Sequence, residues 1–273
     1  MDFHLNYFVE ISALFGLVVG SFLNVVIHRL PIIMERKWQE EAQVKESDST
    51  IYNLVTPRSH CPACGHQIKA WENIPLFSYI YLGGKCSACK VPISLRYPIV
   101  EALTAVLAAE IASRFGFGLY AFAAFYLTAG LIALTFIDID TQLLPDSITL
   151  PLLWIGLLVN TVSGFTDLKS AVIGAVASYF IPYGVAKIFN LVTARDGMGY
   201  GDFKLMAVIG AWFGWQAIPA MLVISGISAS VVGLGMILMG KKGILSKIPF
   251  GPYLALSALC LLFFRQQLTL LYL

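Results

Sequence analysis

Apolar segments follow one another along most of this chain and constrain its fold more than any other feature. Phe8 to Ile27 is a first stretch of membrane-spanning length, and similar segments run from Pro98 to Leu273. Hydrophobic residues make up 58% of the 273, charged residues only 12%, and the mean hydropathy is +0.77. Lipid offers no hydrogen-bond partners to the backbone, so spans of this length are expected to be α-helices. The sequence therefore predicts an all-α polytopic membrane protein.

Polar breaks between the apolar segments predict about eight transmembrane helices at roughly 20 residues each. Phe8 to Ile27 lacks the basic start and cleavage site of a signal peptide, so we expect it to be retained as the first span. The later breaks lie near Arg114, Asp138 to Asp146, Gly164 to Lys169, Arg195 to Lys204, Trp215, Lys241 to Lys247 and Arg265. Only about a dozen apolar residues follow Lys204, so we expect that segment to be short, tilted or re-entrant.

Charge divides the chain into three parts. We expect residues 1–30 to contain the first transmembrane helix, residues 31–97 to form a soluble loop domain, and residues 98–273 to form the membrane-embedded domain. If the N-terminus lies outside, 15 of the 18 lysines and arginines fall on the inner side, as the positive-inside rule requires. The loop domain is then cytoplasmic. A formal charge of +2 gives no indication of a nucleic-acid partner.

Four cysteines in the loop domain have the spacing of a metal site. Cys61 and Cys64 form one CxxC pair, and Cys86 and Cys89 form a second pair after 21 intervening residues. Four thiolates fill the tetrahedral shell of Zn²⁺ and leave no open position, so this zinc would be structural. Redox-active dithiols are the alternative, although one pair would suffice for that chemistry. His60 or His66 could also replace one of the thiolates.

Two aspartates lie where apolar segments meet the polar breaks. Asp138 directly follows one apolar segment and Asp202 directly precedes another. Ionisable residues near a membrane core are costly and are candidates for function. Two carboxylates close together can share one proton, so that one activates water while the other donates to a carbonyl. This pattern suggests an aspartyl protease. A transporter or ion-conducting protein could instead use the same pair as a carboxylate relay for protons or ions. A zinc-containing membrane scaffold without chemistry is a third possibility.

Glycines at 197, 199 and 201 precede Asp202 and would let an extended substrate approach the backbone. The same run superficially matches a nucleotide-binding loop, but that loop requires a preceding β-strand, and here a membrane span precedes it.

Three other polar residues have structural interpretations. Asn24 lies within the first span and is expected to hydrogen-bond a neighbouring helix. Asp146 precedes an apolar helix and is expected to cap its N-terminus. Asp196 is expected to be a solvated turn residue.

Four segments in order make the sequence resemble the bacterial prepilin leader peptidase family, the GxGD aspartyl proteases that also N-methylate their products. The segments are GSFLNVVIHRLP, RSHCPACGHQIKAWENIPLFSYIYLGGKCSACKVPISLRYPIVEALTA, FIDIDTQLLPD and GMGYGDFKLMA. The resemblance runs from Gly20 to Ala207 and covers most of the chain. The resemblance implies an enzyme of the bacterial inner membrane that cleaves the short basic leader from type IV prepilins or type II secretion pseudopilins. It then methylates the new N-terminus with S-adenosylmethionine.

The resemblance also implies roles for particular residues. The first catalytic aspartate of the family lies seven residues before a proline, here Pro145, which selects Asp138 over Asp140. The second is the aspartate of GxGD, here Asp202.

The remaining implied roles concern the glycines and the loop domain. Gly199 and Gly201 would line the path of the substrate. The four cysteines match the zinc-binding loop of the family, and Gly84 and Lys85 match a segment associated with methyl transfer.

Overall fold

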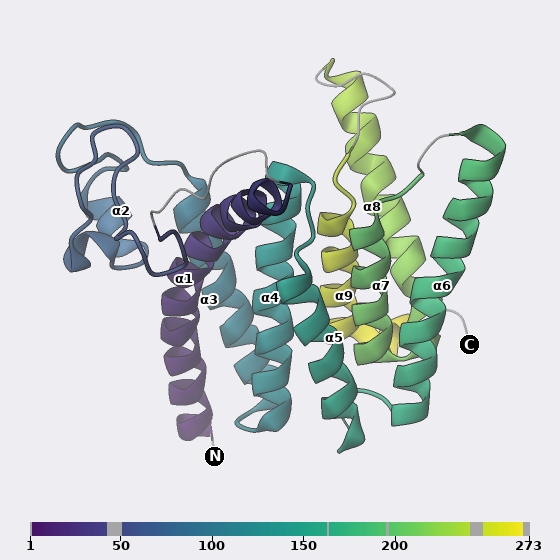
Figure 1. Cartoon of the computed structure of the whole chain (residues 1–273). Helices are drawn as coiled ribbons and strands as arrows, with labels where there is room; N and C mark the ends of the chain where they lie inside the picture. The colour runs from purple at the N-terminus through teal and green to yellow at the C-terminus, as the bar shows by residue number, and fades with distance from the viewer. Residues whose placement is uncertain (1, 43–50, 163, 195–196, 241–247, 270–273) are drawn as a thin grey trace. The chain divides into compact units, whose positions relative to one another are not determined.

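The chain is all-helical, with no β-strand among the residues that the structure describes. The structure is a computed structural model, and it describes residues 2–42, 51–162, 164–194, 197–240 and 248–269. Eight of its helices have 14 residues or more (Figure 1). The prediction of an all-α protein is confirmed.

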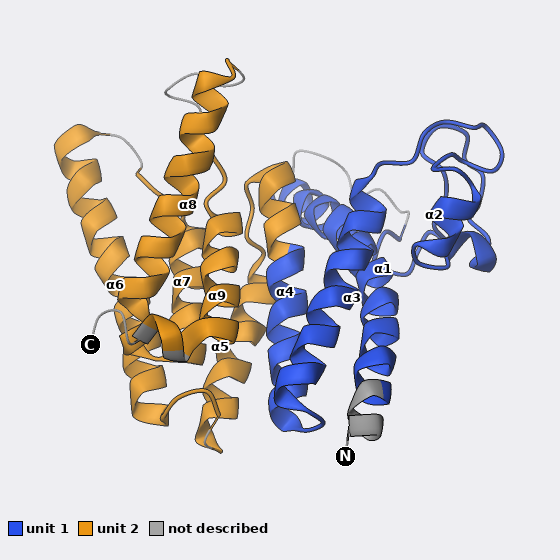
Figure 2. Ribbon diagram, turned by 180° about the vertical axis from the view of Figure 1, so that it is seen from behind, with its two compact units in different colours: residues 1–133 blue, residues 134–273 orange. Residues whose placement is uncertain are grey.

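The helices fall into two compact units (Figure 2). The long helices are α1 (Asp2–Glu41), α3 (Arg96–Phe115), α4 (Leu119–Thr141), α5 (Asp146–Thr161), α6 (Leu168–Thr193), α7 (Tyr200–Phe213), α8 (Ile218–Leu238) and α9 (Gly251–Thr269). The short elements are the 3-10 helix η1 (Ala70–Asn73), the helix α2 (Phe77–Tyr81) and the 3-10 helix η2 (Trp215–Ala217). The first unit is Met1–Ala133 and the second Leu134–Leu273, so the division falls within α4.

Within the described ranges, four helices are long and apolar enough to cross a membrane. They are Tyr7–Glu41, Leu119–Thr141, Leu168–Thr193 and Trp215–Leu238, and two shorter apolar helices are Asp146–Thr161 and Gly251–Arg265. A protein with several membrane helices is thus confirmed, while the total of eight spans stays a prediction. Helix α7 has 14 residues and is about 21 Å long, less than the roughly 30 Å of hydrocarbon. This agrees with the expectation of a short segment after Asp202.

In the first unit, α1 packs along α3 through two glycines one helical turn apart. A side chain at Gly16 would lie 2.7 Å from the Cα atom of Ala105, and one at Gly20 would lie 2.7 Å from the Cα atom of Glu101. Such small residues let membrane helices approach closely. Asn24 donates from Nδ2 to the carbonyl of Tyr97 at 3.1 Å, which confirms its predicted role. Helix α1 continues beyond residue 30 to Glu41, with Pro31 inside it.

In the second unit, α7 forms the core and is contacted by α5, α6 and α9. Its residues from Leu205 to Phe213 are all buried. The ring of Trp212 packs against Gly156 of α5, where a Cβ atom would lie 2.5 Å from the indole, and its Nε1 donates to the carbonyl of Leu152 at 2.8 Å. Asn160 of α5 donates to the carbonyls of the last turn of α7. Backbone groups at the end of α7 are therefore satisfied by a neighbouring helix.

The backbones of α6 and α7 come into direct contact at a pair of glycines. A Cβ atom at Gly174 would lie 2.5 Å from the carbonyl oxygen of Gly210, and a Cβ atom at Gly210 would overlap the backbone of Gly174. Neither position has room for a methyl group unless the helices separate. This crossing fixes the distance between α6 and the helix that carries Asp202.

We predict that Gly174→Ala lowers the free energy of unfolding by about 1–3 kcal/mol, the usual cost of overpacking. The matched control is Gly184→Ala, on the same helix, where an added Cβ meets no atom within 4 Å. There the substitution should stabilise or be neutral, since alanine favours helix over glycine. Melting of both variants in detergent checks this, and equal shifts would contradict the proposed crossing.

Candidate active site and metal centre

Asp138 lies in the last turn of α4 and is buried, with 4% of its surface exposed. Its Oδ2 atom accepts a hydrogen bond of 2.8 Å from the backbone N–H of Gly251. Gly251 is the first residue of α9, so its N–H has no acceptor within its own helix. The carboxylate thus satisfies a helix end that water could not easily reach. It is also held in one orientation by a segment 113 residues away.

Position 251 has no room for a side chain. A Cβ atom there would lie 2.8 Å from the same Oδ2 atom of Asp138 and 3.1 Å from a methyl carbon of Leu144. The sequence analysis did not identify Gly251 as part of the site. Its only signal is the glycine-proline pair that follows a polar break, which is typical of a helix start rather than of a site.

Asp202 lies in the first turn of α7, and it is half-buried. Its backbone N–H donates to the carbonyl of Gly199, the N-cap residue, at 3.1 Å. An acidic side chain in the first turn is favoured by the partial positive charge at the helix N-terminus. Local backbone structure therefore positions the second aspartate.

Leu144 connects the surroundings of the two aspartates. Its Cβ atom lies 2.8 Å from where a Cβ of Gly201 would be, and Gly201 directly precedes Asp202. Its Cδ2 atom lies 3.1 Å from the corresponding position of Gly251, which binds Asp138. The side chain of Leu144 therefore lies between the two glycines that adjoin the two aspartates. The surroundings of Asp138 and Asp202 therefore share one side chain.

The two glycines of the GxGD segment have different surroundings. At Gly201 the space that a side chain would take is filled by Leu144. At Gly199 the nearest atom to an added Cβ is a carboxylate oxygen of Asp202, at 3.3 Å. The absent side chain of Gly201 thus has a packing reason within the protein. The expectation that Gly199 and Gly201 line a substrate path stays a prediction.

Aromatic rings from α6 pack around the first turn of α7. The ring of Tyr183 lies 6.2 Å from that of Tyr200 and 5.9 Å from that of Phe203, measured between centroids. Tyr200 and Phe203 flank Asp202 in the sequence and also contact each other. One side of the Asp202 turn is therefore aromatic, and Tyr200 remains largely exposed.

The other acidic residues near the site differ from Asp138 in their surroundings. Asp146 was expected to cap a helix, but the N-cap of α5 is Pro145, and no side chain caps it. Instead both carboxylate oxygens of Asp146 accept hydrogen bonds from Lys204 Nζ, at 2.6 and 2.8 Å, and these tie α5 to α7. The capping prediction is therefore wrong. Asp140 is exposed, and Asp196 lies outside the described residues.

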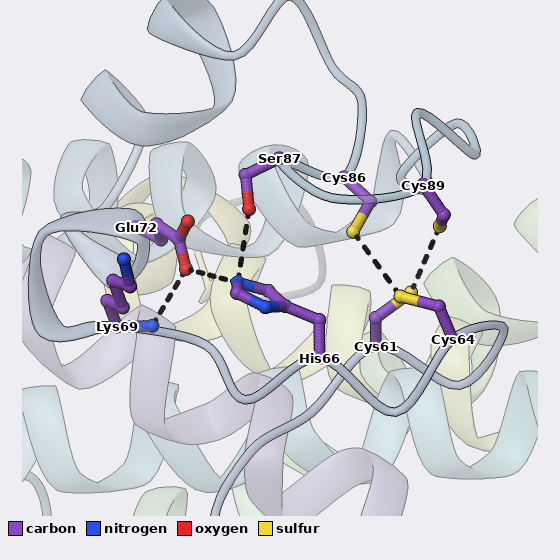
Figure 3. Close-up of polar contacts among 8 residues, drawn as sticks. All are labelled: Cys61, Cys64, His66, Lys69, Glu72, Cys86, Ser87 and Cys89. Atoms are coloured by element: carbon purple, nitrogen blue, oxygen red, sulfur yellow. Dashed lines mark hydrogen bonds and ion pairs between the residues drawn. The ribbon is translucent and has the colours of Figure 1, made fainter.

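The four loop cysteines form a single cluster (Figure 3). All four Sγ atoms lie within 4.8 Å of one another, with 3.8 Å between Cys61 and Cys89 and 4.0 Å between Cys64 and Cys86. A regular tetrahedron with Zn–S bonds of about 2.3 Å has sulfurs about 3.8 Å apart. The cluster thus has the dimensions of a four-thiolate zinc site, and among the described residues it includes no histidine.

The thiols of the cluster are not equivalent. Backbone N–H groups of Cys89 and Ala88 lower the pKa of Cys86 to about 6. The backbone N–H of His66 lowers the pKa of Cys64, but desolvation and the three neighbouring sulfurs together outweigh it and raise this pKa to about 11. The thiolate is the form that binds metal, so the backbone N–H groups around Cys86 favour the form of this thiol that a metal requires.

His66 lies beside the cluster and joins its two halves. Its Nε2 atom is 3.2 Å from Ser87 Oγ in the second CxxC pair and 3.3 Å from Glu72 Oε2 (Figure 3). Glu72 also accepts from the backbone N–H of Lys69 at 2.8 Å, which is the main reason that its pKa is lowered. His66 thus braces the loop instead of replacing a thiolate, and Nδ1 of His60 lies 3.1 Å from the carbonyl of Arg58.

Gly84 and Lys85 directly precede the second CxxC pair. Gly84 has a φ of +66°, and an added Cβ would lie 2.9 Å from the hydroxyl of Tyr79, so the position requires glycine. The Lys85 side chain is exposed. The part of these residues in methyl transfer stays a prediction.

Comparisons with known proteins match both parts of the chain. Residues 14–115 match the bacterial peptidase A24 N-terminal domain, and residues 125–234 match the type IV leader peptidase family. No solved structure matches the chain.

Several relatives named prepilin leader peptidase/N-methyltransferase are similar over nearly their whole length. The protein of Stutzerimonas stutzeri is 49% identical, covering 97% of this chain and 94% of its own. The protein of Aeromonas hydrophila is 50% identical, covering 95% and 92%, and that of Pseudomonas aeruginosa is 49% identical, covering 97% and 93%. These relatives cover two thirds or more of both chains at well over 30% identity. The chain belongs to the type IV leader peptidase family.

Proposed function

We propose that this protein cleaves the short basic leader from type IV prepilins or type II secretion pseudopilins and then methylates the new N-terminal residue. The observation that carries the peptidase is the arrangement of Asp138 and Asp202 around Leu144, with Gly251 binding the first aspartate. Family membership favours a peptidase over a carboxylate relay for transport. In this proposal residues 98–273 form the peptidase domain.

The two aspartates would act as a general base and a general acid. The ionised carboxylate takes a proton from a water molecule, whose oxygen attacks the scissile carbonyl carbon. The protonated carboxylic acid donates its proton to the carbonyl oxygen, which gives a neutral tetrahedral intermediate. Proton transfer to the amide nitrogen then releases the leader. Gly251 keeps one oxygen of Asp138 occupied, so the other oxygen is the one available to water and substrate.

Depth in the membrane agrees with the proposed substrate. Asp138 ends an apolar helix and Asp202 begins one, so both lie near a membrane boundary. A basic leader stays on the cytoplasmic side under the positive-inside rule, while the apolar segment that follows it lies in the bilayer. The scissile bond then comes to rest at the same boundary. Exposed Asp140 would attract the basic leader, an effect that salt weakens.

The loop domain, residues 31–97, would support methyl transfer. S-adenosylmethionine supplies the methyl group, and Gly84 and Lys85 are the residues that we propose to contact it. Zinc on Cys61, Cys64, Cys86 and Cys89 would be structural, because four thiolates leave no position for a substrate. Its role is to hold the two CxxC turns together and so to fix the segment that contains Gly84.

We expect Asp138→Asn and Asp202→Asn each to lower the cleavage rate of a purified prepilin by roughly 100-fold or more, since each carboxylate has its own proton to move. The matched control is Asp140→Asn, two residues along the same helix but exposed, which should retain most of the activity. Single-turnover cleavage in detergent measures all three. If the Asp138→Asn variant were active and the Asp140→Asn variant inactive, the assignment of Asp138 as the first catalytic aspartate would be wrong.

The Gly251 contact gives the same site a second test. Gly251→Ala should impair cleavage strongly, because the added Cβ would lie 2.8 Å from the Asp138 carboxylate. Gly235→Ala on α8, where an added Cβ meets no atom within 4 Å, should cleave normally. Normal cleavage by the Gly251→Ala variant would show that this contact is not needed for catalysis.

Zinc analysis tests the metal centre. We expect about one Zn²⁺ per chain in the purified protein. A Cys61→Ser, Cys86→Ser double variant should lose the metal and lose methyl transfer more completely than cleavage, because metal binding also folds such loops. Cys260→Ser, outside the cluster, is the matched control. Undiminished methylation in the double variant, or no zinc in the wild type, would remove the metal from this mechanism.

Accessibility tags test the orientation. Tags near residues 141 and 198 should both report the cytoplasmic side and a tag near residue 166 the opposite side, because 15 of the 18 basic residues then lie inside. If the first two tags lay on opposite sides, Asp138 and Asp202 could not form one site.

A further inference from the structure

Five large apolar side chains are exposed on the loop that connects the two CxxC pairs. They are Trp71, Ile74, Phe77, Ile80 and Tyr81, and between 47% and 81% of each is exposed. We call this set the apolar ledge. The rings of Trp71 and Tyr81 contact each other edge to face at 6.2 Å, so the two ends of the segment meet. Exposed apolar patches of this kind mark surfaces that contact a partner or a membrane.

A hydrogen bond to α3 fixes the level of the apolar ledge along α1, the membrane helix that packs against α3. The backbone N–H of Leu76, directly before Phe77, donates to Glu101 Oε2 of α3 at 2.9 Å. Glu101 is buried, and its Cα atom packs against Gly20 of α1. Gly20 lies seven residues before the end of the apolar stretch at Ile27, which corresponds to about 10 Å of helix. The apolar ledge therefore begins beside the apolar part of α1, not beyond it.

A second tether holds the loop at the end of the same apolar stretch. Arg29, two residues after Ile27, is buried and donates to the carbonyls of Asn53 at 3.0 Å and Pro57 at 2.6 Å. The loop is thus attached to α1 just past the end of its apolar stretch, and to α3 at a level within that stretch. Ile99 and Leu103, on either side of Glu101 in the sequence, are themselves exposed, so apolar surface on α3 continues at the level of the apolar ledge.

Charge indicates the kind of membrane surface. Residues 51–100 contain five basic side chains and one acidic side chain, Glu72, which is already hydrogen-bonded to Lys69 and His66. Lys69 and Lys85 precede and follow the apolar ledge in the sequence, and both are exposed. Aromatic and aliphatic side chains next to lysines are typical of segments that lie in the headgroup region of anionic bilayers.

We propose that the apolar ledge inserts into the boundary between headgroups and acyl chains of a leaflet that contains anionic lipid. The four-cysteine loop is then a module of the membrane surface, held there by lipid contact as well as by Glu101 and Arg29. This placement keeps the loop at the level where a substrate chain leaves the bilayer. The inference depends on the tethers and on exposure within the first unit, and it holds whether or not the loop transfers methyl groups.

Photo-crosslinking in lipid nanodiscs tests the proposal. A photoreactive phenylalanine analogue replaces Phe77 or Ile80 in the full-length protein, in discs of phosphatidylcholine with phosphatidylglycerol. The control position is Gln67, which is exposed in the same loop but outside the apolar ledge. We expect several-fold more lipid adduct from positions 77 and 80 than from 67, and a lower yield in discs of phosphatidylcholine alone. Zinc content of each variant shows that its loop is intact.

Other results would overturn the proposal. Adducts from 77 and 80 to peptides of the same chain, or to a second copy of it, would show that protein covers the apolar ledge. Lipid adducts no more abundant than at position 67 would show that it faces water. Equal yields with and without phosphatidylglycerol would remove the preference for anionic lipid. Quenching of Trp71 fluorescence by brominated lipid, taken as the difference between wild type and Trp71→Phe, gives an independent readout with the same expectation.

Discussion

A helix that begins in an apolar environment has backbone N–H groups that water cannot satisfy, and the start of α9 meets this constraint with the carboxylate of Asp138. The hydrogen bond from Gly251 satisfies the donor and orients the acid at the same time. Because Gly251 has no side chain, Leu144 can pack against it, and the same leucine fills the space beside Gly201. That contact positions Gly201, and Asp202 directly follows it in the sequence. One helix-start requirement thus links three segments that are distant in the sequence.

Close approach of backbones is the second recurring feature. Gly174 and Gly210 bring α6 onto α7, Gly156 admits the ring of Trp212, and Gly20 brings α1 onto α3. An apolar side chain gains little free energy by leaving lipid to pack against another helix, because both surroundings are apolar. Tight van der Waals packing and internal hydrogen bonds therefore decide how helices associate. A helix of 14 residues such as α7 is held by these contacts and by the carbonyl partners that Asn160 supplies.

The sequence was sufficient to predict the features that depend on local pattern. Apolar runs gave the helices, CxxC spacing gave the cysteine cluster, and the amide of Asn24 in a span gave its bond to another helix. The contact of Gly251 with Asp138 spans 113 residues, and no local pattern contains it. At Asp146 the local pattern predicted a contact that the structure does not contain. An aspartate near a helix start favours a cap, but Lys204, 58 residues away, offers a charged donor that binds the carboxylate instead.

The two candidate sites differ in what holds them together, and this decides which changes each can tolerate. Around the aspartates, backbone and side-chain atoms fill the space left by glycines, so adding one methyl group is more disruptive than removing a surface charge. The cysteine loop has few buried side chains, and its order depends on four sulfurs, a histidine bridge and two tethers to helices. Its zinc would be part of its folding energy, so removing ligands would disorder the whole loop. Loss of order in the loop and loss of fit at the aspartates are therefore separate physical events, so a substitution at one candidate site can leave the other intact.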